Sequence, residues 1–276
     1  MSSKAGALYP AKATYFPTPE GYKLARIDSF EHAFFPEEKG LGGGKPRKRV
    51  SVVKPDEDVA NAKMEENARR SVRRARLRLY DLLMCNSGLN LWVTLTYSPE
   101  KVDKSSYSDC YSVFKVWASN GVQRAGLRYV GVPELTKKGD VHFHLMCNAE
   151  AVKLVRAINP HTGRPLSQKG RAVYNVENWP GGFSTAIYTD RDSSPRALAL
   201  YMLKYMGKDV GFKVGGRYVL TGGKLEKPVE VVGECVQEFL TGGEVYTGDY
   251  QVDIDRVGVF RRVEFDPFTR GTGKSC

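Results

Sequence analysis

The sequence predicts an α+β fold, and three observations predict it. Residues 91–97 alternate in polarity and are rich in β-branched and aromatic residues, which is typical of a strand. Residues 128–148 contain two further alternating runs on either side of a polar turn with Gly139, which indicates a β-hairpin. Helical spacing of apolar side chains occurs in three other segments, residues 56–84, 103–120 and 192–208.

The composition is that of a folded, basic protein. The chain has 276 residues, 41% of them hydrophobic, which allows one large domain with extensions. Its net charge of +11 favours a polyanionic partner, nucleic acid before a membrane surface. No apolar run approaches roughly 18 residues, no signal-peptide core is present, and the five cysteines are irregularly spaced without a Cys-x-x-Cys pair. We therefore expect a cytoplasmic protein with no membrane partner, no disulfide framework and no structural zinc.

The first segments predict an irregular arm followed by a basic helix. Residues 1–55, with scattered Gly, Pro and aromatic residues, predict the arm. The helix over 56–84 has an apolar stripe that ends in Leu79 and Leu82. Arginines fill its other faces, and we expect four of them to contact DNA phosphates: Arg69, Arg70, Arg73 and Arg74. The alternative is a solvated face whose arginines pair with acids from elsewhere in the fold.

The middle of the chain supplies strands and an aromatic helix. Thr94 and Thr96 share one face of the strand over 91–97, and both are candidate DNA-binding residues. The aromatic residues of the helix over 103–120 are assigned to the core rather than to base stacking. Residues 149–158 predict a short helix and residues 173–176 a strand. From residue 213 to 276 the chain predicts a β-rich extension.

The hairpin places potential metal ligands on one face. His142 and His144 are two residues apart on a strand, so their side chains point to the same side. If Leu135 pairs with Val141, Glu134 lies directly opposite His142. Two imidazoles and a carboxylate would form a three-ligand site with open positions, suited to a divalent ion. The alternative is a solvated or hydrogen-bonded histidine pair.

The helix over 192–208 contains two tyrosines on one face. Tyr201 and Tyr205 are four residues apart, and Lys204 and Lys208 form a neighbouring row. The pattern Tyr-x-x-Lys therefore occurs twice in tandem. Such tyrosines are either candidate nucleophiles or amphipathic side chains at the edge of a core.

Three signals in this order resemble the HUH endonuclease superfamily, and most of all the rolling-circle replication initiators of small single-stranded-DNA phages and plasmids. They are Thr94-Leu95-Thr96, His142-Phe143-His144 and Tyr201-x-x-Lys204-Tyr205. The acid eight residues before the first histidine resembles the gene II type of filamentous phages, and the doubled Tyr-x-x-Lys resembles the two-tyrosine initiators of microviruses. The resemblance covers about residues 66–212, and we expect an endonuclease domain over residues 56–212.

The resemblance implies a fold, a reaction and its residues. The fold would be a ferredoxin-like or palm-like antiparallel sheet flanked by helices, with the His-x-His motif on a central strand. Glu134, His142 and His144 would hold Mg²⁺ or Mn²⁺. Tyr201 or Tyr205 would attack origin DNA, leaving a 5′-phosphotyrosine link and a 3′-OH primer, and Lys204 and Lys208 would assist. Because the sequence has no motif of a nucleotide-hydrolysing motor, a host helicase and replisome are expected partners.

Two other classes of function fit parts of the pattern. The first is another HUH enzyme, a relaxase or a single-strand transposase, although relaxases often carry three histidines. The second is a non-catalytic basic protein that binds or packages DNA, with structural His and Tyr residues. Metal-dependent nicking of a supercoiled plasmid would separate the enzyme classes from the binding protein.

Overall fold

The structure is a computed structural model that describes residues 11–18, 21–31, 57–189, 194–206, 217–233, 245–254 and 258–266. The chain divides into two compact units. The central unit is Met64–Lys227, and the terminal unit combines Met1–Lys63 with Pro228–Cys276. Antiparallel sheets and helices confirm the predicted α+β class. Among the described helices, none combines the length and the apolar character needed to cross a membrane.

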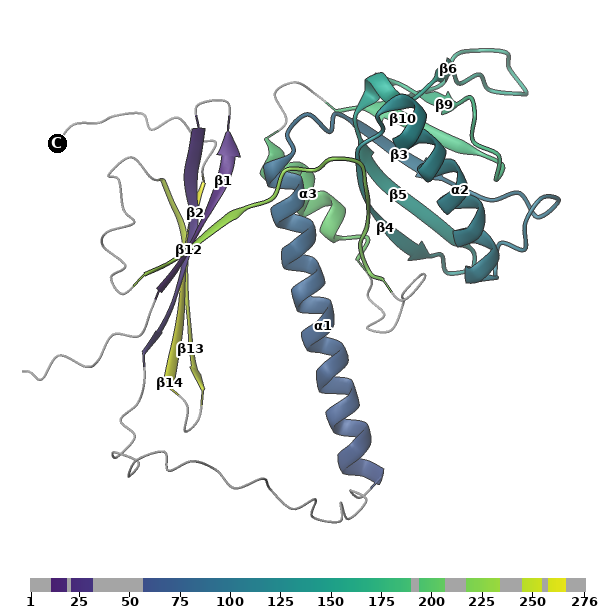
Figure 1. The fold of residues 1–276 in the computed structure, drawn as a ribbon. Coiled ribbons are helices and arrows are strands. Elements are labelled where there is room, and N and C mark those ends of the chain that lie inside the picture. The colour runs from purple at the N-terminus through teal and green to yellow at the C-terminus, as the bar shows by residue number, and fades with distance from the viewer. Residues whose placement is uncertain are drawn as a thin grey trace, which may run out of the picture. The chain divides into compact units, whose positions relative to one another are not determined.

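The central unit is built on a seven-stranded antiparallel sheet (Figure 1). Its strand order is β11-β4-β5-β3-β10-β9-β6, so β5 and β3 are interior strands. A separate two-stranded ribbon consists of β7 (Ser167–Gln168) and β8 (Arg171–Ala172). The sheet strands are β3 (Leu91–Leu95), β4 (Tyr129–Leu135), β5 (Val141–Cys147), β6 (Leu154–Arg156), β9 (Tyr174–Val176), β10 (Ser184–Tyr188) and β11 (Leu220–Gly222).

Helix α2 (Tyr107–Ala125) covers one face of this sheet, as Figure 1 shows. Phe114 and Trp117 are buried in the same core as Phe143 of β5, and the rings of Phe114 and Phe143 stack with centroids 4.6 Å apart. This confirms the core assignment of the helix aromatics. The helix begins at Tyr107 because the Ser106 side chain accepts a hydrogen bond from the amide of Asp109, which is an N-cap.

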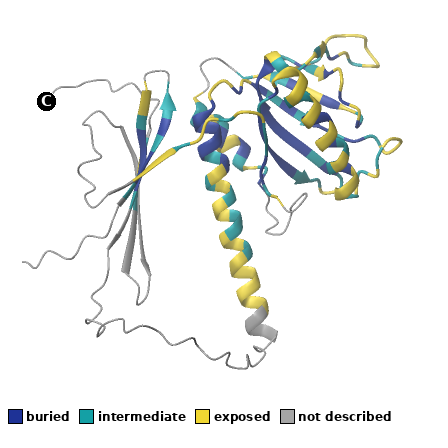
Figure 2. Ribbon diagram, viewed as in Figure 1, coloured by how far each residue is buried: buried dark blue, intermediate teal, exposed yellow. Residues whose placement is uncertain are grey.

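The other face of the sheet packs against α1 (Glu57–Cys85) and α3 (Pro195–Leu203). Leu79 and Leu82 of α1 are buried with Met146 of β5 and Met202 of α3. Figure 2 shows that α1 is exposed along most of its described length and buried at its C-terminal end. The predicted apolar stripe is therefore confirmed where it meets the sheet.

Residues 149–158 do not form the predicted helix. They contain one 3₁₀ turn, Ala149–Ala151, followed by strand β6. Leu154 and Arg156 pair with Val176 and Tyr174 of β9. A ten-residue window has too few turns to establish a helix by itself, so pairing with a neighbouring strand decided the conformation.

The terminal unit contains a five-stranded antiparallel sheet made from both ends of the chain. Its order is β12-β1-β2-β14-β13, with β1 (Ala11–Thr18), β2 (Gly21–Glu31), β12 (Val229–Gly233), β13 (Val245–Ile254) and β14 (Gly258–Asp266). The expectation of an irregular arm over residues 1–55 is therefore wrong for residues 11–18 and 21–31. The β-rich extension forms strands as predicted, and it pairs with the segment that was expected to be irregular.

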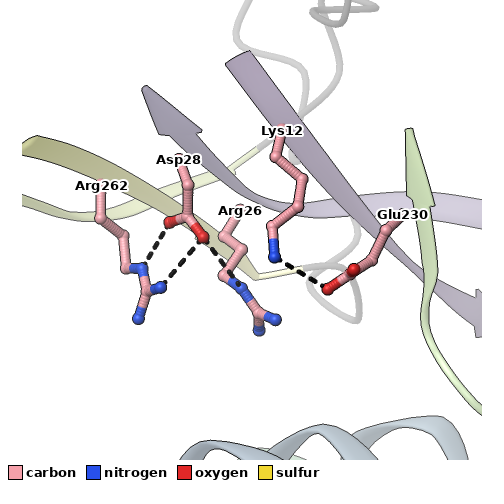
Figure 3. A network of polar contacts seen from close by, with 5 residues as sticks. All are labelled: Lys12, Arg26, Asp28, Glu230 and Arg262. Atoms are coloured by element: carbon pink, nitrogen blue, oxygen red, sulfur yellow. Dashed lines mark hydrogen bonds and ion pairs between the residues drawn. The ribbon is translucent and has the colours of Figure 1, made fainter. Parts of the chain in front are cut away.

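Ion pairs link strands of the terminal sheet that are neighbours in the sheet but far apart in the sequence (Figure 3). Asp28 of β2 accepts two hydrogen bonds from Arg262 of β14, at 2.6 and 3.0 Å, and Arg26 lies 4.0 Å from the same carboxylate. On the other side of β1, Lys12 pairs with Glu230 of β12 at 3.0 Å. Asp28 and Arg262 are direct partners in the register, so the fork-like contact fixes the alignment of these strands.

Candidate active site

The β4–β5 hairpin has the predicted register. Leu135 pairs with Val141, and Glu134 lies opposite His142. The turn is closed by hydrogen bonds from the amide of Thr136 to the carbonyl of Asp140 and from the amide of Gly139 to the carbonyl of Thr136. Gly139 has a φ of 85°, a conformation that residues with a Cβ rarely adopt, so glycine is favoured at this position. The predicted carboxylate and imidazoles therefore share one face of the sheet.

The carboxylate of Glu134 contacts His144 rather than the directly opposed His142. Its Oε2 lies 2.6 Å from His144 Nε2, and Thr94 Oγ1 lies 3.2 Å from His144 Nδ1. The hydrogen bond from His144 is the main reason that the pKa of Glu134 is lowered. An ionised carboxylate can only accept, so Nε2–H donates to Glu134, while Nδ1 lies within hydrogen-bond distance of the hydroxyl of Thr94. Two neighbours thus fix the orientation of the His144 ring.

His142 lies next to the Glu134–His144 pair. Its ring centroid is 6.5 Å from that of His144. Burial, and then the neighbouring His144, lower the pKa of His142, which favours the neutral imidazole. Within the described residues, no group of three His, Cys, Asp or Glu side chains is already arranged to hold a metal ion. The three predicted ligands are neighbours on one face, and the ionised Glu134 and neutral His142 are in the forms that bind a cation.

The two phenols come from the end of α3. Ser194 caps the helix by accepting a hydrogen bond from the amide of Ala197, and Pro195 occupies its first turn. The helix ends at Leu203, and the following turn continues with hydrogen bonds between residues three apart. Tyr205 lies in this turn rather than in the helix. Its hydroxyl is nevertheless 2.8 Å from that of Tyr201.

The phenols lie against the histidine face of the sheet. The rings of Tyr205 and His144 have centroids 4.1 Å apart. Trp92 of β3 contacts both tyrosines, with centroid distances of 5.0 Å to Tyr201 and 5.4 Å to Tyr205. Burial, followed by the hydrogen bond with Tyr201 and then by nearby charge, raises the pKa of Tyr205. The structure therefore brings together the three segments in which candidate residues were predicted.

Two cationic side chains lie close to the end of α3 and the turn that carries Tyr205. Lys204 Nζ lies 5.6 Å from the centre of the Tyr201 ring. Arg76 of α1 donates hydrogen bonds from Nη1 to the carbonyls of Leu203, at 3.2 Å, and Met206, at 3.4 Å. Leu203 is the last residue of α3 and Met206 lies in the turn that follows, where the negative end of the helix dipole favours a cation. Lys208, the fourth predicted catalytic residue, lies outside the described residues.

The predicted DNA-binding residues have mixed environments. Arg69 lies 3.5 Å from Glu65, and Arg70 forms an ion pair with Glu66, so acids of the same helix neutralise part of the arginine row. Arg73 and Arg74 are exposed, and Arg74 lines a cavity of about 470 Å³ with Arg78 and Arg217. Thr94 contacts His144. Thr96 lies just after β3, where its carbonyl accepts a hydrogen bond from the indole of Trp179.

Sequence reasoning missed two residues that contribute to the site. Trp92 lies two residues before Thr94 on the same strand, so strand alternation places it on the same face, and that signal was available. Arg76 was counted among the arginines of α1, but its contacts with carbonyls 127 and 130 residues away in the sequence have no local signature.

Comparison with known proteins gives one match. Residues 90–210 match the model of the family of replication-associated proteins described by its ORF2 and gene II protein members. No curated protein matches the chain, and no solved structure does. The matched segment is less than half of the chain, but it contains the hairpin ligands, Trp92, Thr94 and both tyrosines. In the part that carries the candidate site, this chain is similar to replication-associated proteins, which supports a role in initiating rolling-circle replication.

Proposed function

We propose that this chain is an HUH-type initiator that nicks origin DNA with a tyrosine to start rolling-circle replication. The observation that carries the proposal is the 4.1 Å contact between the rings of Tyr205 and His144. It joins the end of α3 and its following turn, which bear the two phenols, to the hairpin that bears two imidazoles and a carboxylate. A phosphodiester lying beside this contact would be within reach of a nucleophile from one segment and of cation ligands from the other.

The cleavage step transfers a phosphoryl group without loss of bond energy. The phenol oxygen forms a bond to phosphorus while the bond from phosphorus to the 3′ oxygen breaks. The phenol proton leaves the nucleophile, and the departing 3′ oxygen takes up a proton to become the 3′-OH primer. The 5′ end remains as a phosphotyrosine, and the reverse attack by a 3′-OH rejoins strands at termination.

Tyr201 is the better first nucleophile of the two. Its side chain is 44% exposed, so DNA can reach it, whereas burial raises the pKa of Tyr205 and disfavours its phenolate. With the hydroxyls 2.8 Å apart, Tyr205 can donate a hydrogen bond to Tyr201 when Tyr201 loses its proton. Lys204, with Nζ 5.6 Å from the centre of the Tyr201 ring, offers a positive charge to the phosphate. Tyr205 then remains for the attack that ends the round.

Glu134, His142 and His144 would hold a divalent ion, Mg²⁺ or Mn²⁺. When bound, such an ion polarises a non-bridging phosphate oxygen and stabilises the charge that builds on phosphorus. The chain's own groups fit this role, because the pKa of Glu134 is lowered and that of His142 is lowered, which leaves an anion beside a neutral ring. With an ion at Nε2 in place of the proton, His144 would carry its proton on Nδ1 and donate it to the hydroxyl of Thr94, 3.2 Å away, which holds the ring in place.

A short single-stranded oligonucleotide from the origin, incubated with the protein and Mn²⁺, tests the proposal. The wild type should form a covalent adduct that survives denaturing electrophoresis. Tyr201→Phe should remove most of it, and the double variant with Tyr205→Phe should remove all. Peptide mass mapping of the adduct identifies the linked tyrosine. No adduct from the wild type, or an adduct from the double variant, would contradict the nicking mechanism and leave a DNA-binding protein.

His142→Ala separates cleavage from binding. It should abolish adduct formation while most of the charge-driven affinity for DNA remains. Undiminished cleavage by this variant at low Mg²⁺ would exclude the ligand role. The proposal also assigns a host helicase and replisome as partners, because the 3′-OH has to be extended on an unwound template.

A further inference from the structure

A groove of about 450 Å³ lies next to the two phenols. Its size is within the roughly 300–1,000 Å³ of small-ligand pockets. Outward-facing residues of β3 and β10 form its floor, where Thr185 pairs with Thr94. Tyr201 and Tyr205 line it on the α3 side, and the β7–β8 ribbon lines it with Gln168 and Lys169. The groove is thus continuous with the candidate active site.

The chemistry of the lining fits one unpaired nucleotide. Trp92 and Tyr188 offer aromatic faces, and Tyr188 is 46% exposed. The hydroxyl of Thr185 and the amide of Gln168 can donate and accept hydrogen bonds at a base edge, and Lys169 offers a cation to phosphate. None of the described residues that line the groove is an acid. Stacking surfaces beside a cation are the combination with which proteins bind single-stranded nucleic acid.

The conformation of Lys169 gives independent support. Its φ is 51° and that of Gly170 is 77°, so both central residues of the β7–β8 turn are left-handed. Such turns favour Asn-Gly, because a residue with a bulky side chain is disfavoured at positive φ. Among the described residues, Lys169 is the only one other than glycine with a positive φ. A strained lysine that lines a groove beside the phenols points to a use for its ammonium group.

We propose that this groove holds the base of one nucleotide adjacent to the scissile phosphate and thereby selects the sequence at the nick. The inference rests on the proposed function, since it takes Tyr201 or Tyr205 as the group that attacks that phosphate. Trp92 links the two sites because it lines the groove and contacts both phenols. Lys169 holds the backbone of the same nucleotide, and Tyr188 stacks on its base.

Binding without a divalent ion tests the groove independently of cleavage. The probes are a labelled oligothymidylate of about 20 nucleotides and an abasic chain of equal length. The wild type should bind the oligothymidylate more tightly. In Tyr188→Ala this preference should fall about five- to tenfold, the usual size of one lost stacking contact. Lys169→Asn suits the turn better and removes the cation, so it should weaken binding of both probes.

Lys115→Gln is the matched control, because it removes one exposed positive charge from α2, on the opposite face of the sheet. The inference is overturned if Lys169→Asn binds like this control and Tyr188→Ala keeps the full preference for bases.

The adduct assay then separates the two proposals. With cleavable DNA and Mn²⁺, both groove variants should raise KM with little change in kcat, and abasic substitution at one position beside the nick should have the same effect. If both groove variants form the adduct with the same KM as Lys115→Gln, the groove assignment is overturned and the proposed function stands. A wild type that binds DNA but forms no adduct would overturn the proposed function and, with it, the placement of the groove beside a scissile phosphate.

Discussion

The sheets of the two units differ in the size of their hydrophobic cores and in the sequence separation of the contacts that stabilise them. In the central unit, β4 and β5 are joined by a short turn, and the hydrophobic core on the α2 side is large. In the terminal unit, Asp28 and Arg262 meet across 234 residues, and the described core cluster consists of Ala13, Leu24 and Ile27 with two neighbours. One sheet is specified by local alternation and burial, and the other by pairing of the chain ends supported by charge. Four predictions probe this difference, from the largest expected effect to the smallest.

Phe143→Ala should be the most destabilising change. Phe143 is fully buried in β5 and stacks on Phe114 of α2, so its truncation leaves a cavity in the larger core. We expect a loss of about 3–5 kcal/mol in the free energy of unfolding. Denaturant unfolding followed by circular dichroism measures it. A loss below about 1 kcal/mol would show that the central unit does not depend on this core.

Asp28→Ala should destabilise the terminal unit and spare the central one. It leaves the nearly buried Arg26 and the half-buried Arg262 without their shared carboxylate, with an expected loss of about 2–3 kcal/mol. Amide hydrogen exchange should show lost protection in β1, β2 and β14 and unchanged protection in β5. Adduct formation should be unchanged, and a parallel loss of adduct would show that the terminal sheet supports the active site.

Arg76→Ala should slow cleavage with a small effect on folding. Removing its hydrogen bonds to Leu203 and Met206 frees the turn that carries Tyr205, and we expect roughly a tenfold lower kcat, about 1.4 kcal/mol. KM for the oligonucleotide should change little. Arg124→Ala, at the end of α2, is the charge-matched control. An equal kcat in Arg76→Ala and Arg124→Ala would contradict the positioning role of Arg76.

Lys12→Ala should have the smallest effect. Its pair with Glu230 lies in the same sheet as Asp28, but both side chains are more exposed than that carboxylate, at 38% and 48% against 12% for Asp28. An exposed pair of this kind contributes about 0–1 kcal/mol. A thermal unfolding shift as large as that of Asp28→Ala would indicate that overall charge, rather than the buried carboxylate, supports the terminal sheet.

The sequence predicted what depends on neighbours in the chain. Hairpin alternation fixed the register of Glu134 opposite His142, and helical spacing placed Tyr201 beside Tyr205. It could not predict that the Glu134 carboxylate reaches diagonally to His144, because two positions were within reach of one side chain.

The pairing of strands from opposite ends of the chain could not be predicted from the sequence, for a different reason. Residues 11–15 pair with residues 229–233 near the other end of the chain, and no local sequence pattern identifies the partner of such a strand. The contact of Arg76 with the end of α3 is equally non-local. Strand pairing and capping across such distances depend on the assembled fold.

Arg76, Leu79 and Leu82 all precede the segment that matches the replication-associated family. A truncation to residues 90–210 would therefore expose apolar residues of α3 such as Met202 and remove the hydrogen bonds from Arg76 to Leu203 and Met206. A minimal active fragment should therefore retain the second half of α1, because that half packs against α3 and holds the turn that carries Tyr205.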